Sequence, residues 1–169
     1  MTTHVLILCT HNSARSVLAE GMLNHLARQA GRDIRAHSAG SAPSGRINPL
    51  ALEALRKAGV DVAGVRSKRW DEFTGPDAPR MDFVITLCDV LQGQHCPDFG
   101  DKPVTGAWPL PDPAKFAGSA VEHAIMINEL YGMIRRRLDI FVNLPYASLD
   151  RMALKKRLDE IGDSARQPA

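Results

Sequence analysis

The chain has 169 residues, a formal net charge of +2 at pH 7 and a hydrophobic content of 44%. This length and composition predict one globular domain over residues 1–162, followed by a disordered tail over 163–169. The mild charge gives no clustered basic face for nucleic acid, and no apolar stretch reaches the length of a membrane span or a signal peptide core. We therefore expect a cytoplasmic protein without nucleic-acid or membrane partners.

Strand and helix patterns alternate through the first half of the chain. Apolar runs predict strands and helical spacing predicts helices, which Gly31 and Gly59 terminate. The second helix opens at Asn48-Pro49, because Asn is a favourable N-cap and Pro fits the first helical position. In chain order we expect a strand at 4–8, a helix at 14–30, a strand at 34–39, a loop at 40–49, a helix to about 57, an extended segment at 60–65 and a helical turn at 70–73.

The second half continues the alternation with longer loops. The long helix there is expected to bury Ile125 and to expose the basic run Arg135-Arg136-Arg137, while Ser148 is expected to cap the helix that follows. In chain order we expect a strand at 83–87, a long loop at 89–103, a strand at 104–108, a proline-rich loop at 109–113, a helix from about 119 to 141 and a last helix to about 161.

Strands that alternate with helices are typical of an α/β protein. We predict a three-layer α/β/α sandwich around a central, mostly parallel, four-stranded sheet. Ligands of such sheets bind at the carboxyl ends of the strands. Cys9, Cys88 and the loop from Trp108 to Asp112 each follow a predicted strand directly, so we expect them to meet at one edge of the sheet.

The stretch from Cys9 to Ser16 combines a thiol with an anion-binding geometry. Cys9 ends the first strand, and Arg15 begins the first helix after five intervening residues. The N–H groups of a helix N-terminus attract an oxyanion, and the Arg15 guanidinium matches two oxygens of a tetrahedral anion. The same field favours the thiolate form of Cys9, to which Ser16 can donate a hydrogen bond. Asn12 tolerates the left-handed backbone that a tight loop needs, and we interpret Cys9 as a nucleophile.

The pattern Cys9-(five residues)-Arg15-Ser16, placed directly after one N-terminal strand, resembles the low-molecular-weight protein tyrosine phosphatase family. Within it, Cys-Thr-His-Asn-Ser-Ala-Arg-Ser is similar to the arsenate reductase branch, and the similarity extends to Ser38-Ala39-Gly40, to residues 83–88 and to Asp112-Pro113. The resemblance implies a low-molecular-weight phosphatase-like fold. It also implies that the oxyanion binds to a loop formed by Thr10, His11, Asn12, Ser13, Ala14, Arg15 and Ser16.

The resemblance further implies that Cys88 and Cys96 form a thiol relay with Cys9 that reduces arsenate. Cys9 would attack arsenic, Cys88 would attack the Cys9 sulfur as arsenite leaves, and Cys96 would then attack Cys88 to form a second disulfide. Two extra cysteines favour thioredoxin as the reductant, with glutaredoxin or a low-molecular-weight thiol as the alternative. A zinc site at Cys88, His95 and Cys96 does not match the usual paired spacing, so we expect no metal and no cofactor.

By resemblance, Asp112 is the general acid that gives a proton to the leaving oxygen. It lies in a loop that three prolines stiffen. Tyrosine phosphatases of this fold have aromatic residues just after the Asp-Pro pair, as a wall for the substrate ring. This chain has Ala114-Lys115 there, and Phe116 is the nearest aromatic residue. The difference favours a small inorganic anion, such as arsenate with phosphate or sulfate as competitors.

Some arsenate reductases of this fold hold a potassium ion beneath the loop with Asn, Glu, Ser and an acidic residue. Asn12, Glu20 and Ser38 match three of these positions, and Ser16 completes the predicted support of the loop. At the fourth position this chain has Lys68. We therefore expect the Lys68 ammonium group to replace the ion and to bond the Asn, Glu and Ser side chains directly. An activity that rises with potassium would contradict this expectation.

Two other functions fit part of the pattern. A phosphatase of the same fold, acting on phosphotyrosine or another phosphomonoester, would leave Cys88 and Cys96 without a role. A non-enzymatic, thiol-based redox or oxyanion sensor would leave Arg15 and Asp112 without one. Arsenate reduction for arsenic detoxification uses all of these residues and is the predicted function.

Overall fold

A computed structural model of the chain describes residues 2–87, 99 and 103–164. The elements in chain order, with η for a 3-10 helix, are β1 (Thr3–Cys9), α1 (Arg15–Gln29), β2 (Ile34–Gly40), α2 (Pro49–Lys57), η1 (Trp70–Phe73), β3 (Phe83–Thr86), β4 (Val104–Ala107), η3 (Pro113–Lys115), α3 (Ala120–Val142), η4 (Tyr146–Ser148) and α4 (Arg151–Ser164). The four predicted strands and the four long predicted helices are all present, within a few residues of their expected bounds.

The strands form one four-stranded parallel sheet with the order β2-β1-β3-β4. Cys9 at the end of β1 lies opposite Gly40 at the end of β2. Leu8 lies opposite Thr86 on β3, which in turn lies opposite Ala107 on β4. The carboxyl ends of the strands therefore share one edge, and the predicted α/β class with a central parallel sheet is confirmed.

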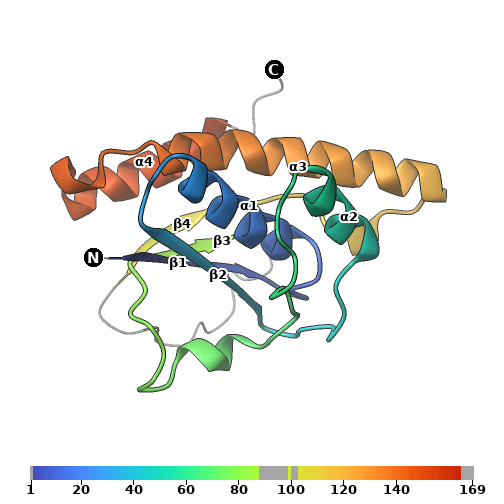
Figure 1. Cartoon of the computed structure of the whole chain (residues 1–169), viewed down its shortest axis with the longest axis horizontal. Coiled ribbons are helices and arrows are strands. Elements are labelled where there is room, and N and C mark those ends of the chain that lie inside the picture. Colours follow the sequence, from blue (N-terminus) through green and yellow to red (C-terminus); the bar gives the residue numbers. More distant parts are fainter. Residues whose placement is uncertain (1, 88–98, 100–102, 165–169) are drawn as a thin grey trace.

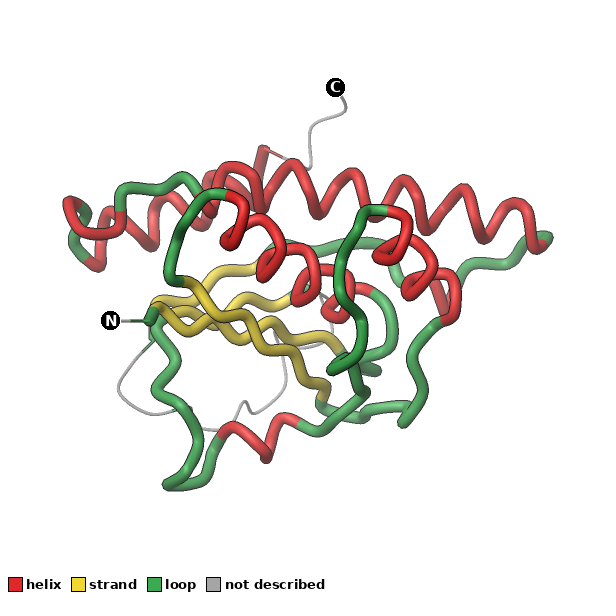
Figure 2. The backbone as a smooth tube through the Cα atoms, in the orientation of Figure 1, coloured by secondary structure: helices red, strands yellow, loops and turns green. Residues whose placement is uncertain are grey.

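The α-helices lie on one side of this sheet and the η1 segment lies on the other, as Figures 1 and 2 show. Helix α1 packs against β2 and α3, and α4 packs against β4. Val5, Leu18 and Phe141 are fully buried on this side of the sheet. On the opposite face η1 contacts β2 and buries Trp70 and Phe73. In the described part of the chain, the second helical layer is thus a 3-10 helix with its flanking turns.

Residues 60–65 were predicted as an extended segment, and this prediction was wrong. They form a loop with a turn in which the Val65 N–H donates to the Val62 carbonyl at 3.2 Å. The segment crosses from α2 to the far face of the sheet without a strand partner among the described residues. The valines at positions 62 and 65 are half-buried against the core, but the segment has no neighbouring strand whose side chains would reinforce their β propensity among the described residues.

The last helix also differs from its prediction at both ends. Ser148 closes η4 instead of capping α4. Asp150 takes that role, because its carboxylate accepts the backbone N–H of Ala153 at 2.8 Å. The helix continues to Ser164, so residues 163 and 164 belong to it and not to the expected tail.

The buried face of α3 lies elsewhere than predicted at two positions. Ile125 is 53% exposed, whereas Arg137, expected in the solvated basic run, is only 3% exposed. The helical period explains both, because Ile125 lies two residues before the buried Ile127, while Arg137 lies three residues after Ile134 and four before Phe141. No helix in the described part of the chain, α3 included, is long and apolar enough to cross a membrane.

We expect acid to destabilise the fold through His37. Its imidazole lies 3.0 Å from that of His4, between His4 Nδ1 and His37 Nε2, and burial together with this neighbour lowers the pKa of His37 from 6.5 to about 4. The unfolded chain therefore takes up a proton first as the pH falls from 6.5 towards 4, and the free energy of unfolding decreases across this window. At this half-exposed site, solvent screening limits the loss to about 1 kcal/mol.

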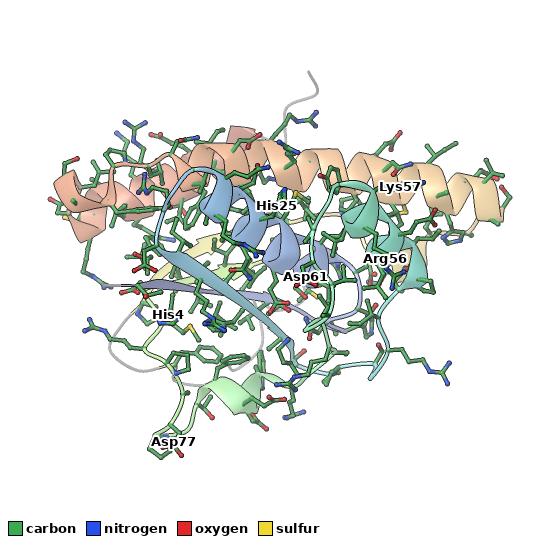
Figure 3. All side chains as sticks on the ribbon, viewed as in Figure 1. His4, His25, Arg56, Lys57, Asp61 and Asp77 are labelled. Atoms are coloured by element: carbon green, nitrogen blue, oxygen red, sulfur yellow. The ribbon has the colours of Figure 1, made fainter. Side chains whose placement is uncertain are left out.

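Urea unfolding at several pH values between 7 and 4 measures this effect. In a His37→Asn variant this component of the pH dependence should disappear. His25→Asn is the matched control, since His25 lies on α1, away from the His4–His37 pair (Figure 3). A constant difference in unfolding free energy between wild type and His37→Asn at all pH values would contradict the assignment.

Candidate active site

The loop of residues 10–14 joins β1 to α1 with a backbone that only particular residues allow. Asn12 has a φ of 46°, the left-handed conformation that Asn tolerates better than most residues. A Cβ atom at Gly40, at the end of β2, would lie 2.5 Å from the Thr10 carbonyl oxygen and 3.1 Å from the Asn12 nitrogen. Glycine at this position is therefore what lets the loop lie against the strand.

The carbonyl groups of this loop point towards the segment between β2 and α2. Backbone N–H groups of residues 42, 44 and 48 donate to the carbonyls of residues 10, 11 and 13 at 2.9, 3.0 and 2.9 Å, respectively. The oxygens that would repel an anion are thus engaged elsewhere. Within the described chain, the first turn of α1 has neither a side-chain cap nor an acidic residue. Its N–H groups are therefore free to bind an anion.

The Cys9 thiol is buried and hydrogen-bonded. Its Sγ lies 2.9 Å from Ser16 Oγ, and 2% of the residue is exposed. The Asn12 amide donates to the same Ser16 oxygen at 2.8 Å. Because Ser16 Oγ accepts this bond, its own proton can be donated to the sulfur, which stabilises the thiolate form. The contact between Ser16 and Cys9 and the left-handed backbone of Asn12 were both predicted from the sequence.

A pocket of about 250 Å³ opens above the sulfur. Arg15 and Asp112 meet in it, with Nη2 and Oδ2 3.5 Å apart and side chains that are 5% and 14% exposed. Arg15 Nη1 donates to the Leu110 carbonyl at 3.4 Å, and Asp112 Oδ1 accepts the Ala114 N–H at 3.0 Å. The pocket is lined by Cys9, His11, Ser13, Ala14, Arg15, Asn48, Asp112, Pro113, Ala114 and His123.

A polar network lies beneath the loop. The Lys68 backbone N–H donates to Asn12 Oδ1 at 2.8 Å, and the Lys68 ammonium group lies 3.7 Å from Glu20 Oε1 and donates to the Arg66 carbonyl at 3.1 Å. The Asn12 amide donates to Ser38 Oγ at 3.0 Å, and Glu20 Oε1 accepts the Ser38 N–H at 3.0 Å. The ammonium group thus reaches Glu20, as expected. The ammonium group does not make the other two expected bonds, to Asn12 and Ser38. Asn12 is bound by the Lys68 backbone, and Ser38 is bound by Asn12 and Glu20, because the Lys68 side chain extends past the loop towards Glu20.

Burial dominates the electrostatics of this network. It raises the pKa of Glu20 above its ordinary value of 4.5, although the charge of Lys68 and bonds from Ser38 act in the opposite direction. Burial also lowers the pKa of Lys68 below 10.5, and Glu20 opposes that shift. For both partners the loss of hydration outweighs the mutual attraction. The surrounding fold therefore keeps Glu20 and Lys68 together, and the attraction between them does not make up for the hydration that both lose.

The site contains residues that the sequence reasoning missed as well as those that it predicted. The predicted loop, Asp112 and the supporting side chains come together, while Cys88 and Cys96 lie outside the described residues. Asn48 and His123 were missed, although both line the pocket. Each of these two residues had a signal in the sequence. The signal for Asn48 was its predicted role as the N-cap of the helix that follows the loop at 40–49.

The second signal is the Ser-x-x-Glu pattern at the start of α3. Ser119 Oγ accepts the Glu122 N–H at 3.2 Å, and the Glu122 carboxylate accepts the Ser119 N–H at 3.1 Å. This capping box fixes where the helix begins. With the helix start known, His123 falls in the first turn of the element that directly follows the Asp112 loop.

A buried cysteine below an arginine-bearing anion loop, with a carboxyl group at the mouth, defines the class of phosphatase-like enzymes that act on tetrahedral oxyanions through a thiol. Residues 4–152 match the family model of the low molecular weight phosphotyrosine protein phosphatases, so the chain belongs to this family. The resemblance predicted from the Cys9 loop is thereby confirmed.

Several relatives of this chain are named arsenate reductases. Those of Oceanobacillus iheyensis and Bacillus licheniformis are 30% and 32% identical over 137 and 138 residues, which is 81% of this chain and 93% of each relative. A solved arsenate reductase in the phosphate-binding state has a TM-score of 0.64 at 26% identity and covers 83% of this chain and 97% of its own. The thioredoxin-dependent arsenate reductase of Corynebacterium glutamicum has a TM-score of 0.54 at 30% identity and covers 80% of this chain and 59% of its own.

Proposed function

We propose that this chain reduces arsenate to arsenite in the cytoplasm, with Cys9 as the nucleophile. The pocket offers a buried thiol, a guanidinium and a carboxyl group around one anion-sized space. Relatives named arsenate reductase align with 81% of the chain, which supports this substrate over other tetrahedral anions. Their activity fits arsenic detoxification as the biological role.

The first step joins arsenic to sulfur. Arsenate binds with its oxygens against the N–H groups of loop residues 10–16 and the guanidinium of Arg15. The Cys9 thiolate attacks arsenic and displaces a hydroxyl group, which takes a proton from Asp112 and leaves as water. The Ala114 N–H holds Asp112 Oδ1, and Oδ2 lies in the pocket beside the Arg15 guanidinium, next to where the anion binds and a proton can be transferred.

The second step supplies two electrons, which we assign to Cys88. Its thiolate attacks the Cys9 sulfur, the sulfur–arsenic bond breaks with its electron pair on arsenic, and arsenite leaves. Cys96 then attacks Cys88, which releases Cys9 as a thiolate and forms a Cys88–Cys96 disulfide. An external dithiol such as thioredoxin reduces that disulfide, with glutaredoxin or a low-molecular-weight thiol as the alternative reductant.

The position of strand β3 is the observation that carries this proposal. Leu87, the residue before Cys88, donates its backbone N–H to the carbonyl of Leu8, the residue before Cys9, at 2.8 Å. The last described residue before Cys88 is therefore bonded to the residue before the nucleophile. A hydrolase needs no second cysteine directly after this strand in the sequence, whereas a reductase that forms a disulfide on Cys9 does.

Hydrolysis of phosphomonoesters is the second candidate, because both the family and the anion-binding loop of residues 10–16 are compatible with this reaction. Two observations favour the reductase. The first is that Ala114 lines the pocket just after the Asp-Pro pair, where the tyrosine phosphatases of this fold have an aromatic wall. The second is that Phe116 packs against His123 and is not among the described residues that line the pocket. A sensor without turnover would give the buried Arg15–Asp112 contact no chemical role.

The test is a steady-state assay of arsenate-dependent NADPH oxidation, with thioredoxin and its reductase in one arm and glutathione with glutaredoxin in the other. We expect turnover in the thioredoxin arm and its loss in a Cys88→Ser variant. The same variant should still hydrolyse para-nitrophenyl phosphate slowly, because Cys9, Arg15 and Asp112 are unchanged. Undiminished arsenate turnover by Cys88→Ser would eliminate the relay, and phosphatase turnover without any arsenate reduction would favour the second candidate.

A further inference from the structure

His123 lines the pocket, but the proposed mechanism gives it no role. It comes from the first turn of α3 and lines the same space as Cys9 and Arg15. The ring of Phe116 packs behind it, with centroids 4.9 Å apart and an interplanar angle of 85°. The imidazole is therefore held between the pocket and an aromatic ring.

The backbone around Phe116 fixes this arrangement. The Phe116 N–H donates to the carbonyl of Pro113, itself a lining residue, at 3.2 Å. A Cβ atom at Gly118 would lie 2.9 Å from Phe116 Cε1 and 3.2 Å from Glu122 Cβ, so only glycine lets the ring lie over the start of α3. The loop that carries the acid and the helix that carries His123 are thus joined through Phe116.

The polar side chains that line the pocket come from two sides. His11, Ser13, Arg15 and Asn48 belong to the anion loop and its surroundings, whereas Asp112 and His123 line the opposite side, and of the described lining residues His123 alone comes from α3. The N–H groups of loop residues 10–16 and the Arg15 guanidinium can donate hydrogen bonds to the anion oxygens that lie against the loop. At the mouth the anion faces Asp112, a carboxyl group that offers at most one proton. Glu122, the acidic neighbour of His123 on α3, is engaged with the backbone of Ser119 in the capping box. On α3, His123 is therefore the polar side chain that is placed to donate a hydrogen bond to the anion oxygen that points away from the loop.

We propose that His123 is a substrate-binding residue that donates a hydrogen bond from its imidazole to the outward-pointing oxygen of the bound oxyanion. This position is also where the organic group of an ester would leave the cradle, so the ring selects small inorganic anions over aryl esters. The inference rests on the proposed function only in that the pocket binds a tetrahedral oxyanion. It does not depend on the relay or on any reductant.

Protection of Cys9 from alkylation tests the inference without turnover. The full chain is treated with iodoacetamide, a neutral reagent, at increasing concentrations of inorganic phosphate, which Cys9 does not reduce, and modification of the Cys9 peptide is followed by mass spectrometry. We expect His123→Phe, which keeps a ring but removes the donor, to raise the half-protecting anion concentration about tenfold. His123→Gln, which retains a donor, should lose less, and His25→Gln on α1 should equal wild type.

Three outcomes would overturn the inference. One is protection of His123→Phe within twofold of wild type. Another is an equal loss in His25→Gln, which would indicate a general effect on folding. The third is an alkylation rate without anion that changes in His123→Phe, because that would place the residue in the activation of Cys9 instead. In a second arm, phenylphosphonate, an aryl anion without a phosphate ester bond to hydrolyse, should protect wild type less well than inorganic phosphate, and His123→Ala should narrow this difference. An unchanged difference would refute the selection of small anions.

Discussion

Replacing Arg15 by lysine is expected to lower kcat/KM for arsenate by about two to three orders of magnitude. Lysine keeps the positive charge, so the loss would report on the geometry of the guanidinium. Arg15 is buried, contacts Asp112 at 3.5 Å and donates to the Leu110 carbonyl at 3.4 Å, which fixes the plane of its fork over Cys9. An ammonium group is a single point charge and cannot hold two oxygens of the anion while it bonds both neighbours.

The matched control is Arg56→Lys, which makes the same chemical change on the exposed surface of α2 (Figure 3). It should leave kcat/KM within the error of the assay. Circular dichroism and urea unfolding of Arg15→Lys establish that the fold is retained, and Cys9 protection by phosphate measures anion binding directly. A kcat/KM within threefold of wild type in a folded Arg15→Lys protein would show that charge alone suffices in this pocket.

Much of the fold and the centre of the site could be predicted because they depend on short-range rules. A continuous apolar run that ends at Cys9, followed by helical spacing from Arg15, specifies strand, loop and helix with little contribution from distant residues. The parallel sheet then brings Cys9 and the Asp112 loop to the same edge. The interaction of Ser16 with the thiol follows from its place next to Arg15 in the first turn.

Features that depend on how elements meet could not be predicted in the same way. His123 reaches the pocket because α3 packs against the segment that follows Asp112, where the Phe116 ring contacts His123 and Gly118 leaves room for that ring. This is a tertiary effect that a local sequence pattern does not reveal. Arg137 is buried because of the rotation of the same helix, although a run of three arginines normally indicates solvent. The Lys68 ammonium group was expected to bond Asn12, but its backbone makes that bond, since the path of a long side chain is decided by its surroundings.

The Glu20–Lys68 pair is expected to give the largest change in stability. Lys68→Met, a substitution of similar length, should lower the free energy of unfolding by about 3 kcal/mol near neutral pH, because it leaves the Glu20 carboxylate buried without its cation. Glu20→Gln/Lys68→Met should be clearly more stable than the sum of the two single losses, with a coupling energy of more than about 1 kcal/mol. Exposed Lys57→Met on α2 (Figure 3) is the control for lysine removal.

The pH dependence separates this electrostatic effect from simple loss of packing. Burial already raises the pKa of Glu20 in the wild type, and removal of Lys68, which lowers it, should raise that pKa further. A carboxyl group whose folded pKa lies above its unfolded value of 4.5 is stabilising when protonated, and this stabilisation is lost as the pH rises through the folded pKa. The deficit of Lys68→Met relative to wild type should therefore be largest near pH 7 and shrink towards pH 5, as urea unfolding at both values would show. A deficit that is independent of pH, or a rise in wild-type activity on replacing sodium by potassium, would contradict the role of Lys68 as the built-in cation beneath the loop.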